Sequence, residues 1–334
     1  MTQQDFCSDL ATTAISVSQR APNVADAALL RLGAFLRDQN YRFATTTPLT
    51  HSRVIQRGAI EGTNLARAFG WSLPFSASDL PAHVLHALAE AKALAHCRGL
   101  LQSKVRFSTL KDQLYVHSAF PTEAADSVFF GPDTYRFARC IESVFGAPPR
   151  SGLSPRIVDI GCGSGAGGIY AASLMNFGVE LLLTDINPQA VLYARVNATL
   201  NGVERAHAIQ SDLFEGLHGP FDYIFANPPY LVDDLHRLYR HGGGELGIAL
   251  SLDILREGVV QLAQNGRLLL YTGAPIIGGV DQFLAAAKPI LDASPVSFEY
   301  QEVDPDVFGE ELERDAYRSV ERIAAVFLNV KKEG

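Results

Sequence analysis

The chain contains few of the residues that would place it in a specialised structural class. Among its 334 residues are four cysteines, and none of them lies in a CxxC pair or at the Cys/His spacing of a metal site. The sequence therefore predicts no metal site, and it predicts reduced, mostly packed thiols as in a cytosolic protein. The four are Cys7, Cys97, Cys140 and Cys162.

Long apolar runs are absent as well. No stretch is long enough to span a bilayer, so no membrane partner is expected. The first residues, MTQQDFCSDL, lack the basic segment and the apolar segment of a signal peptide. These absences predict a soluble, cytoplasmic protein.

Positive charge is scarce. The 28 Lys and Arg residues stand against 36 Asp and Glu, which gives a net charge of −8 and a pI near 5.6. Because contacts to phosphates need clustered Lys and Arg, this balance weighs against a general nucleic-acid-binding protein, although a local basic patch stays open. The 47% of hydrophobic residues predicts a packed core, and a chain of this length favours two domains.

Residues 1–120 are expected to form a helical N-terminal domain. Apolar residues recur at helical spacing in 24–40, and 81–99 has the start and stop signals of a helix. Residues 105–110 and 114–119, joined by a polar turn, predict a β-hairpin. This order is similar to a winged-helix module. Such modules bind nucleic acid or serve as lids or dimerisation pieces, and the acidic charge favours a lid or a homodimer contact.

Residues 121–334 are expected to form an α/β domain. Its first part, 121–150, is expected to be a bridge from the N-terminal domain, with its boundary at 147–152. Strands and helices then alternate, which predicts a mostly parallel sheet covered on both faces and completed by an antiparallel edge. The expected strands are 156–160, 180–184, 206–210, 221–226, 267–272, 296–302 and 323–330, and the expected helices are 166–177, 188–201 and 251–264.

A glycine-rich run, Val-Asp-Ile-Gly-Cys-Gly-Ser-Gly-Ala at 158–166, lies where a strand is followed by a helix. Glycines allow the backbone to approach a ligand, and the helix N-terminus offers free N–H groups. Gly161, Gly163 and Ala166 also satisfy the dinucleotide pattern G-x-G-x-x-G/A. Asp185, at the end of the next strand, would supply the ribose-binding carboxylate. An NAD enzyme is therefore open at this point.

The run Asn227-Pro228-Pro229-Tyr230 ends a buried strand with two prolines, which remove donors and stiffen the turn. The Asn227 amide and the Pro228 carbonyl are then free to accept hydrogen bonds from one planar NH2 group. The Tyr230 ring could stack on a flat substrate or lie against a cation. The alternative is a turn in which the asparagine only caps local backbone.

Taken together, the acidic residues near the glycine-rich run and the Asn-Pro-Pro-Tyr turn favour a cofactor other than NAD. Asp159 precedes the glycines by two positions, Asp212 follows one βα unit after Asp185, and Asn-Pro-Pro-Tyr has no role in hydride transfer. Singly, each carboxylate is more often a helix cap or a surface charge. As an ordered set, these residues resemble the class I S-adenosylmethionine (SAM) dependent methyltransferases that modify planar amide and amine nitrogens.

The resemblance covers residues 125–330 and is strongest to the HemK-like protein-glutamine methyltransferases and the related methyltransferase small domain. It implies a Rossmann-like sheet, SAM as cofactor and Asn227, Pro228 and Tyr230 as catalytic residues. In the cofactor site it implies that Asp159 and the loop 161–165 hold the methionyl part of SAM. It also implies that Asp185 binds the ribose hydroxyls and that Asp212 and Leu213 flank the adenine. The implied cofactor-binding residues are Asp159, Gly161, Gly163, Gly165, Asp185, Asp212, Leu213, Tyr135 and Asn227. Tyr135 fits ordinary packing at a helix start equally well.

The chain departs from the glutamine-modifying pattern beyond the turn. The usual Glu-Pro step is missing, and a glycine-rich loop at 238–247 stands there, in which Arg240, His241 and Glu245 could contact a substrate or be solvated. The leading prediction is an N-methyltransferase acting on an amide or amine of a protein or small metabolite. A second enzyme would cyclise the aminobutyrate arm of SAM itself to azetidine-2-carboxylate. Methylation of rRNA bases and a winged-helix regulator with a SAM-sensing domain are further alternatives.

Overall fold

The computed structural model describes residues 23–58, 60, 62–145, 154–175, 178–235 and 237–334. The boundary expected at 147–152 lies outside these residues, as does Cys7. Within the described part of the chain, no helix is both long enough and apolar enough to cross a membrane.

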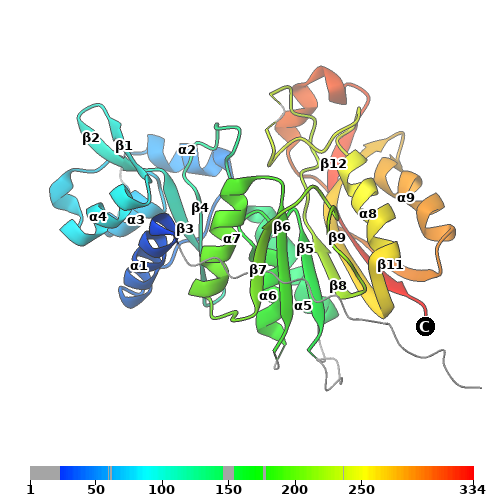
Figure 1. Ribbon diagram of the computed structural model, residues 1–334. Helices are drawn as coiled ribbons and strands as arrows, with labels where there is room; N and C mark the ends of the chain where they lie inside the picture. The colour runs from blue at the N-terminus through cyan, green and yellow to red at the C-terminus, as the bar shows by residue number, and fades with distance from the viewer. Residues whose placement is uncertain (1–22, 59, 61, 146–153, 176–177, 236) are drawn as a thin grey trace, which may run out of the picture.

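The centre of the molecule is one large mixed sheet (Figure 1). Its strand order is β11-β12-β9-β8-β5-β6-β7, with β10 paired to β9. The strands from β9 to β7 run parallel, and β12 and β11 add an antiparallel edge, as the sequence predicted. The strands are β5 (Arg156–Ile160), β6 (Glu180–Asp185), β7 (Ala206–Gln210), β8 (Phe221–Ala226), β9 (Leu262–Ile277), β10 (Val280–Asp281), β11 (Val296–Asp304) and β12 (Arg322–Lys332).

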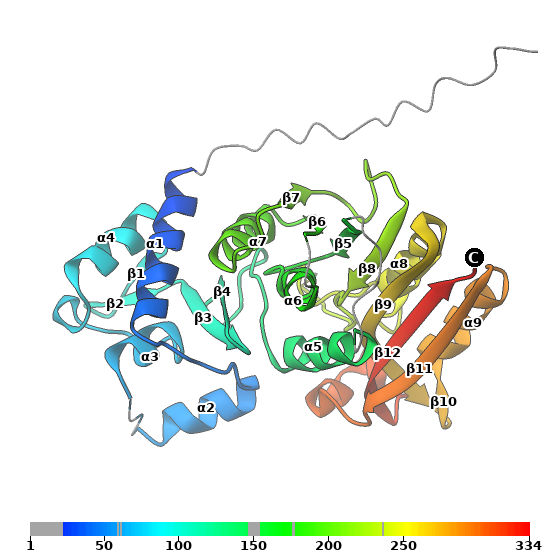
Figure 2. The same cartoon turned by 90° about the horizontal axis from the view of Figure 1, so that it is seen from below.

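Helices cover both faces of this sheet because successive strand residues point to opposite sides. Ile157 of β5 packs with α5, α6 and α7, whereas its neighbour Val158 packs with α8 and α9. Figure 2 shows these two groups of helices on opposite sides. The helices are α5 (Pro132–Val144), α6 (Ala166–Leu174), α7 (Pro188–Leu200), α8 (Ala249–Gln261) and α9 (Gln282–Asp292). The fold is therefore the Rossmann-like α/β sheet that was expected.

Some boundaries of these elements differ from the prediction. The helix expected at 251–264 ends at Gln261, and β9 begins at once with Leu262 instead of at 267. The bridge at 121–150 contains α5, and α9 was not predicted. The apolar residues of α9 recur every four positions, at Phe283, Ala287 and Leu291, but Pro289 interrupts this signal. The expected helix at 166–177 ends at Leu174.

Among the described residues, the N-terminal region contains four α-helices and two hairpins beside the sheet (Figures 1 and 2). They are α1 (Val24–Asp38), α2 (Pro48–Gln56), α3 (Asn64–Phe69), α4 (Ala82–Glu90), β1–β2 (Leu94–Cys97, Leu100–Ser103) and β3–β4 (Val105–Leu110, Gln113–Ser118). The second hairpin is as predicted. The helix expected at 81–99 is wrong beyond Glu90, because Lys92 adopts a left-handed φ of 55° and ends it. Gly99 lies in the turn between β1 and β2 instead of capping a helix.

The N-terminal region packs against the outer side of α7. Its apolar core includes Tyr193, Val196 and Leu200 of that helix, and Arg195 forms an ion pair of 2.9 Å with the buried Asp26 of α1. The apolar core of the N-terminal region thus extends onto α7 of the sheet domain. The division into 1–120 and 121–334 stays a prediction.

Candidate active site

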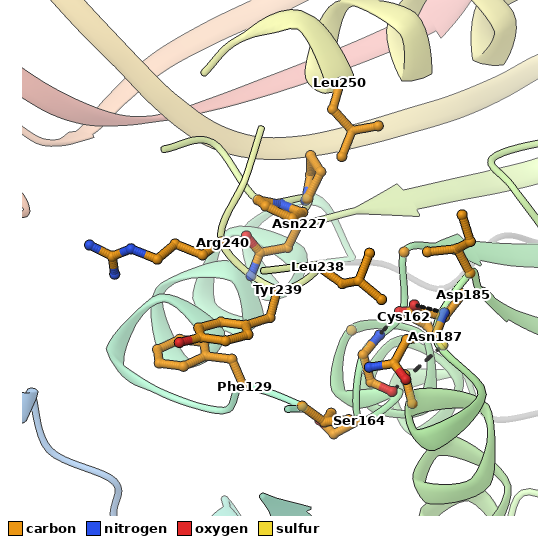
Figure 3. A pocket seen from close by; sticks show the side chains of 18 of the residues that line it. Phe129, Cys162, Ser164, Asp185, Asn187, Asn227, Leu238, Tyr239, Arg240 and Leu250 are labelled. Carbon is orange, nitrogen blue, oxygen red and sulfur yellow. Dashed lines mark hydrogen bonds between the residues drawn. The ribbon is translucent and has the colours of Figure 1, made fainter. Parts of the chain in front are cut away.

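A pocket lies at the carboxyl ends of the parallel strands, beside the point where the strand order changes direction between β5 and β8 (Figure 3). It brings together nine of the residues that the sequence singled out. They are Asp159, Gly161, Gly163, Asp185, Asp212, Leu213, Asn227, Pro228 and Tyr230. Gly165 and Tyr135 do not line it.

The glycine loop joins β5 to α6 with a strained backbone. Gly161 and Gly163 have φ values of 63° and 55°, in the left-handed region that favours glycine. A Cβ on Gly161 would meet no atom within 4 Å, so it would extend into open space at the pocket. A Cβ on Gly165 would instead lie 2.9 Å from Ile169 Cδ1. Gly165 therefore allows α6 and α7 to pack closely behind the loop.

Asp185 fixes the shape of this loop from the end of β6. Its Oδ2 accepts a hydrogen bond of 2.8 Å from Gly163 N, and its Oδ1 accepts one of 2.9 Å from Asn187 N. Burial raises the pKa of the Asp185 carboxyl. The same carboxylate borders the pocket, so it holds the loop while remaining within reach of a ligand.

Asp159 lies deeper and is 2% exposed. Its Oδ2 accepts a hydrogen bond of 2.7 Å from Gly168 N in the first turn of α6. Burial raises its pKa to about 7, opposed by the Gly168 hydrogen bond and reinforced by the Asp185 charge. A Cβ on Gly168 would lie 2.9 Å from Asp159 Cβ, so this glycine lets the carboxylate sit against the helix.

Asp212 and Leu213 follow β7 on the other side of the pocket. Leu213 has a φ of 46°, and Ser211 Oγ stabilises the turn by donating to the carbonyls of Leu213 and Glu215. Asp212 is exposed, and both residues line the pocket. The turn thus presents one carboxylate and one apolar side chain to a ligand.

Asn227 directly follows the last residue of β8 and lines the pocket. Its carboxamide has no hydrogen-bond partner among the described residues, which does not fit an asparagine that only caps local backbone. Figure 3 shows the amide directed toward the cavity, beside Leu238 and Tyr239. The amide is therefore available to an incoming group.

Tyr230 is buried, and its position is fixed from two sides. Its hydroxyl donates to Asp133 Oδ2 over 2.7 Å, and its ring packs on Gly273, where a Cβ would lie 2.2 Å from Tyr230 Cδ2. Asp133 also accepts from the Tyr271 hydroxyl over 2.9 Å and pairs with Arg136. Burial and the Asp133 charge raise the pKa of Tyr230, so the hydroxyl stays protonated. The ring is a fixed wall of the pocket.

The loop that follows the turn covers one side of the pocket. The Tyr239 ring stacks on Phe129, with ring centroids 6.1 Å apart, and its hydroxyl donates to the Thr122 carbonyl over 2.6 Å (Figure 3). Of the three loop residues considered from the sequence, only Arg240 lines the pocket. His241 Nδ1 accepts from Asp233 N, and Glu245 is exposed.

Tyr135 does not take the place that the resemblance implied. Its hydroxyl accepts a hydrogen bond of 3.0 Å from Thr45 N, and its ring packs edge-on against Phe130. The packing alternative therefore describes this residue. The two residues before it, Asp133 and Thr134, line the pocket instead, and Asp133 also accepts a hydrogen bond from Tyr230.

Two further residues were missed by sequence reasoning. Phe129 and Asn197 lie on segments whose importance depends on tertiary contacts. Asn197 of α7 is fully buried, and its Nδ2 donates to the carbonyls of Val116 in β4 and Ser164 in the glycine loop. Only a buried polar residue in an otherwise apolar helix face could have indicated Asn197 in advance.

This arrangement of a glycine loop, two strand-end carboxylates and an Asn-Pro-Pro-Tyr turn around one pocket is that of the class I SAM-dependent methyltransferases. Residues 146–274 match the family model described as the methyltransferase small domain. The chain therefore contains a domain of this class, as its sequence predicted, and the match favours SAM over NAD. The matched residues include the whole of the glycine loop and the turn, but not the N-terminal region.

The release factor glutamine methyltransferase of Deinococcus radiodurans is 34% identical over 131 residues, or 35% of this chain and 45% of that protein. The protein of the same name from Bradyrhizobium diazoefficiens is 32% identical over 157 residues, or 42% and 51%. A ribosomal RNA small subunit methyltransferase C of Photorhabdus laumondii is 28% identical over 139 residues, or 41% and 36%. The chain thus spans about half the length, or less, of these relatives.

The residues of the pocket fit SAM. Open space above Gly161 leaves room for a ligand against the loop backbone, and Asp185 offers its carboxylate to hydroxyl groups. Apolar side chains of Leu213, Leu250 and Ile254 provide surfaces for a flat ring. No cluster of His, Cys, Asp or Glu suited to a metal ion occurs among the described residues.

Proposed function

We propose that the protein is a SAM-dependent N-methyltransferase that modifies a planar amide or amine nitrogen of a protein or small metabolite. One observation carries the proposal. The Asn227 carboxamide, unpartnered among the described residues, lines the same pocket as Gly161, Asp185 and Asp212. An amide held at the end of a rigid strand and left without an internal partner is suited to binding a substrate NH2 group.

The chain's own residues would divide the binding of SAM between them. The backbone of the Gly161–Gly163 loop and Asp159 would hold the methionyl end, Asp185 the ribose hydroxyls, and Asp212 with Leu213 the adenine. When bound, SAM supplies a methyl group on a positively charged sulfur, which a nucleophile displaces in line. This reaction needs little acid–base help, so the chain contributes mainly by orienting the nucleophile.

The turn would provide that orientation. The Asn227 carboxamide oxygen and the Pro228 carbonyl would each accept one hydrogen of the substrate NH2 group, which directs the nitrogen toward the methyl group. The Tyr230 ring, fixed by Asp133 and Gly273, would support the plane of the substrate. Holding a nucleophile at attack distance contributes up to ~7–11 kcal/mol in favourable cases.

The surroundings of the turn favour a protein or small-molecule acceptor over RNA. Arg237, Arg240 and Arg314 lie beside the turn, but each forms an ion pair. Their partners are Asp233, Asp234 and Glu311. Because these positive charges are already compensated, they form no free patch for phosphates. The rRNA alternative therefore has the weaker support from the structure, although four of the relatives bear such a name.

A second candidate is the cyclisation of SAM itself, and the covered side of the pocket favours it. The stacked Phe129 and Tyr239 rings, tied to Thr122, lie next to Asn227 and restrict the approach of a large acceptor. In this reaction Asn227 would orient the amine of SAM toward its own γ-carbon, with release of methylthioadenosine. Aromatic faces at this place would also stabilise the sulfonium charge.

Incubation with SAM followed by mass spectrometry separates the two candidates. The methyltransferase yields S-adenosylhomocysteine only when an acceptor is added, such as a glutamine-containing peptide or a glutamine metabolite. Methylthioadenosine and azetidine-2-carboxylate formed together from SAM alone, above the level without enzyme, would instead establish the cyclase. Asn227→Ala should lower kcat by about 10²–10³-fold, as for the loss of one orienting group, while SAM binding by calorimetry stays nearly unchanged. Full activity of this variant would contradict the assignment of the turn.

A further inference from the structure

A second group of polar side chains is buried in the N-terminal region, away from the cofactor pocket. Arg106 of β3 is 4% exposed, and His51 is 2% exposed and is the buried residue of α2. The His51 ring packs against Trp71 and Phe120, and the Arg106 guanidinium lies over the Phe43 ring at 5.2 Å. None of these residues lines the pocket described above.

Several polar atoms of this group and of the segment just before α2 have no hydrogen-bond partner. They are Thr46 Oγ1, His51 Nδ1, His51 Nε2, Arg106 Nε and Arg106 Nη2. Within the described ranges, one other buried side-chain nitrogen, Nε of Arg240, shares this condition. Because buried polar atoms in folded proteins almost always have a partner in the protein, in ordered water or in a ligand, such a concentration indicates a place for an occupant from outside the described chain.

The charge of the group indicates the sign of that occupant. Arg106 forms no ion pair with a described carboxylate, and the titratable groups that act on it are the hydroxyls of Tyr41 and Tyr135. Burial lowers the pKa of Arg106 to about 10, so it remains a cation at neutral pH. Burial and the Arg106 charge lower the pKa of His51 to about 4, opposed by the Trp71 backbone close to the ring, so the ring is neutral. The group therefore carries a single uncompensated positive charge, which is costly in a protein interior.

We propose that Arg106 binds the carboxylate group of a small monoanion at this place. Nε and Nη2 form one edge of the guanidinium, and this edge matches the two oxygens of a carboxylate in a bidentate pair. The Thr46 hydroxyl and the neutral His51 ring supply further donors. One positive charge balances a monoanion, whereas inorganic phosphate at neutral pH is a mixture of monoanion and dianion, and the dianion would leave a net negative charge. The proposal does not depend on methyl transfer.

Helix α2 provides the way in. Among its residues only His51 is buried, so few contacts hold the helix over the site. The segment before it is attached more firmly, because Thr45 Oγ1 pairs with Ser108 Oγ at 2.6 Å, and Ser108 Oγ pairs with His117 Nε2 at 2.8 Å. Because His51 of α2 is one of the unpartnered groups, a displacement of α2 would open this group to solvent while the hairpin β3–β4 stays in place.

Thermal unfolding and calorimetry of the full chain test this site, with sodium acetate and sodium formate as probes. Sodium chloride at equal ionic strength is the ionic control, and inorganic phosphate is the competing anion. Acetate should raise the Tm of the natural protein in a saturable manner, since it binds the folded state. Sodium chloride at equal ionic strength should not raise the Tm in this way. A carboxylate response that is absent, or is no greater than that of chloride, overturns the proposal.

Substitutions test whether the change of Tm with acetate arises at Arg106. Arg106→Met should abolish the acetate response, and without acetate its Tm should equal or exceed that of the natural protein because a buried unpaired charge is removed. Arg106→Lys keeps the charge but loses the two-donor edge, so acetate should bind roughly tenfold more weakly. Arg42→Met, which changes a mostly exposed arginine, is the matched control and should respond as the natural protein does. Unchanged acetate binding in both Arg106 variants, or Arg106-dependent binding of phosphate alone, contradicts a carboxylate site.

Discussion

The hydroxyl group of Tyr230 donates a hydrogen bond of 2.7 Å to Oδ2 of Asp133, a residue 97 positions earlier in the chain. The other oxygen of the same carboxylate accepts from Tyr271 over 2.9 Å. Both tyrosines are buried, but only Tyr230 lines the pocket. Asp133 thus connects the start of α5 to the turn that we propose as catalytic, and the two tyrosines offer a matched pair of substitutions.

Tyr230→Phe and Tyr271→Phe should have similar effects on stability and different effects on activity. Each removes one hydrogen bond to a charged group, which costs about 1.5–3 kcal/mol of unfolding free energy. Tyr230→Phe should also lower kcat by about tenfold, or about 1.4 kcal/mol, because its ring loses the anchor that holds it against the substrate. Tyr271→Phe should leave kcat nearly unchanged. Equal kcat values in both variants would show that the Asp133 contact has no role in positioning the ring.

Glycine substitutions distinguish contact with the ligand from backbone strain. Gly161 and Gly202 both have positive φ, 63° and 73°, and a Cβ on either meets no atom within 4 Å. Gly161→Ala and Gly202→Ala should therefore each lose about 1–2 kcal/mol of stability from the left-handed backbone. Only Gly161→Ala places a methyl group in the pocket, so only this variant should bind SAM more than about tenfold more weakly by calorimetry, a loss of about 1.4 kcal/mol. Comparable losses of affinity in both would mean that strain, and not contact, is responsible.

Gly165→Ala should behave differently from Gly161→Ala. Its Cβ would lie 2.9 Å from Ile169 Cδ1 and 3.3 Å from Ala194 Cβ, between α6 and α7. Its loss of stability should exceed that of Gly202→Ala, because a clash between packed helices adds about 1–3 kcal/mol to the backbone strain. Chemical denaturation of the three variants side by side measures the difference.

The pKa of Asp159 predicts how the stability of the ligand-free protein changes with pH. The Asp159 carboxyl has a pKa of about 7 in the folded chain, whereas in the unfolded chain it has its ordinary pKa of 3.8. Between these values the unfolded state binds fewer protons, so stability falls as pH rises, by up to about 1.4 kcal/mol per pH unit. Asp185, whose pKa is also raised by burial, contributes in the same direction.

Asp159→Asn isolates this contribution, because its amide oxygen can still accept from Gly168 N. Denaturant unfolding at pH 5 and pH 8 should show a smaller decrease in stability for this variant than for the natural protein. Asp212→Asn removes an exposed carboxylate of the same pocket and should keep the natural decrease. An unchanged pH dependence in Asp159→Asn would mean that Asp159 is ionised throughout this range.

The sequence predicted the sheet and most of the pocket because their signals are local. The glycine loop, Asp185, Asp212 and the Asn227–Tyr230 turn each follow a strand end directly, and the parallel sheet brings such ends together. The segment before the loop was harder to interpret. Both Asp133 and Tyr135 begin α5, but their roles depend on distant partners, Tyr230 for one and Thr45 for the other.

The N-terminal region was predicted least well for a related physical reason. Residues 81–99 have the start and stop signals of one helix, but the chain turns at Lys92 and continues as a hairpin that packs against α4. Likewise, Arg106 and His51 are 55 positions apart and carry no motif. Only their burial together without partners draws attention to them. A local sequence pattern does not predict contacts between residues that are far apart in the chain.

Asn197 connects the N-terminal region to the cofactor loop, and its substitution should affect both. Its Nδ2 donates to Val116 O over 2.9 Å and to Ser164 O over 2.8 Å, and its Oδ1 accepts from Val116 N over 2.8 Å. Asn197→Ala leaves these buried backbone groups unpaired, which costs about 1–3 kcal/mol for each unsatisfied group. Hydrogen exchange should accelerate in β4 and in the glycine loop, and SAM should bind more weakly.

Asn201, one helical turn later, provides the control. It makes the equivalent contacts to β4, accepting from Leu114 N over 3.2 Å and donating to Leu114 O over 3.0 Å, but it does not reach the glycine loop. Asn201→Ala should therefore accelerate exchange near Leu114 and leave SAM affinity unchanged. If both variants weaken SAM binding equally, general loosening of the N-terminal region is the cause. If neither does, the contact of Asn197 with Ser164 is structural only, and the loop is held by Asp185.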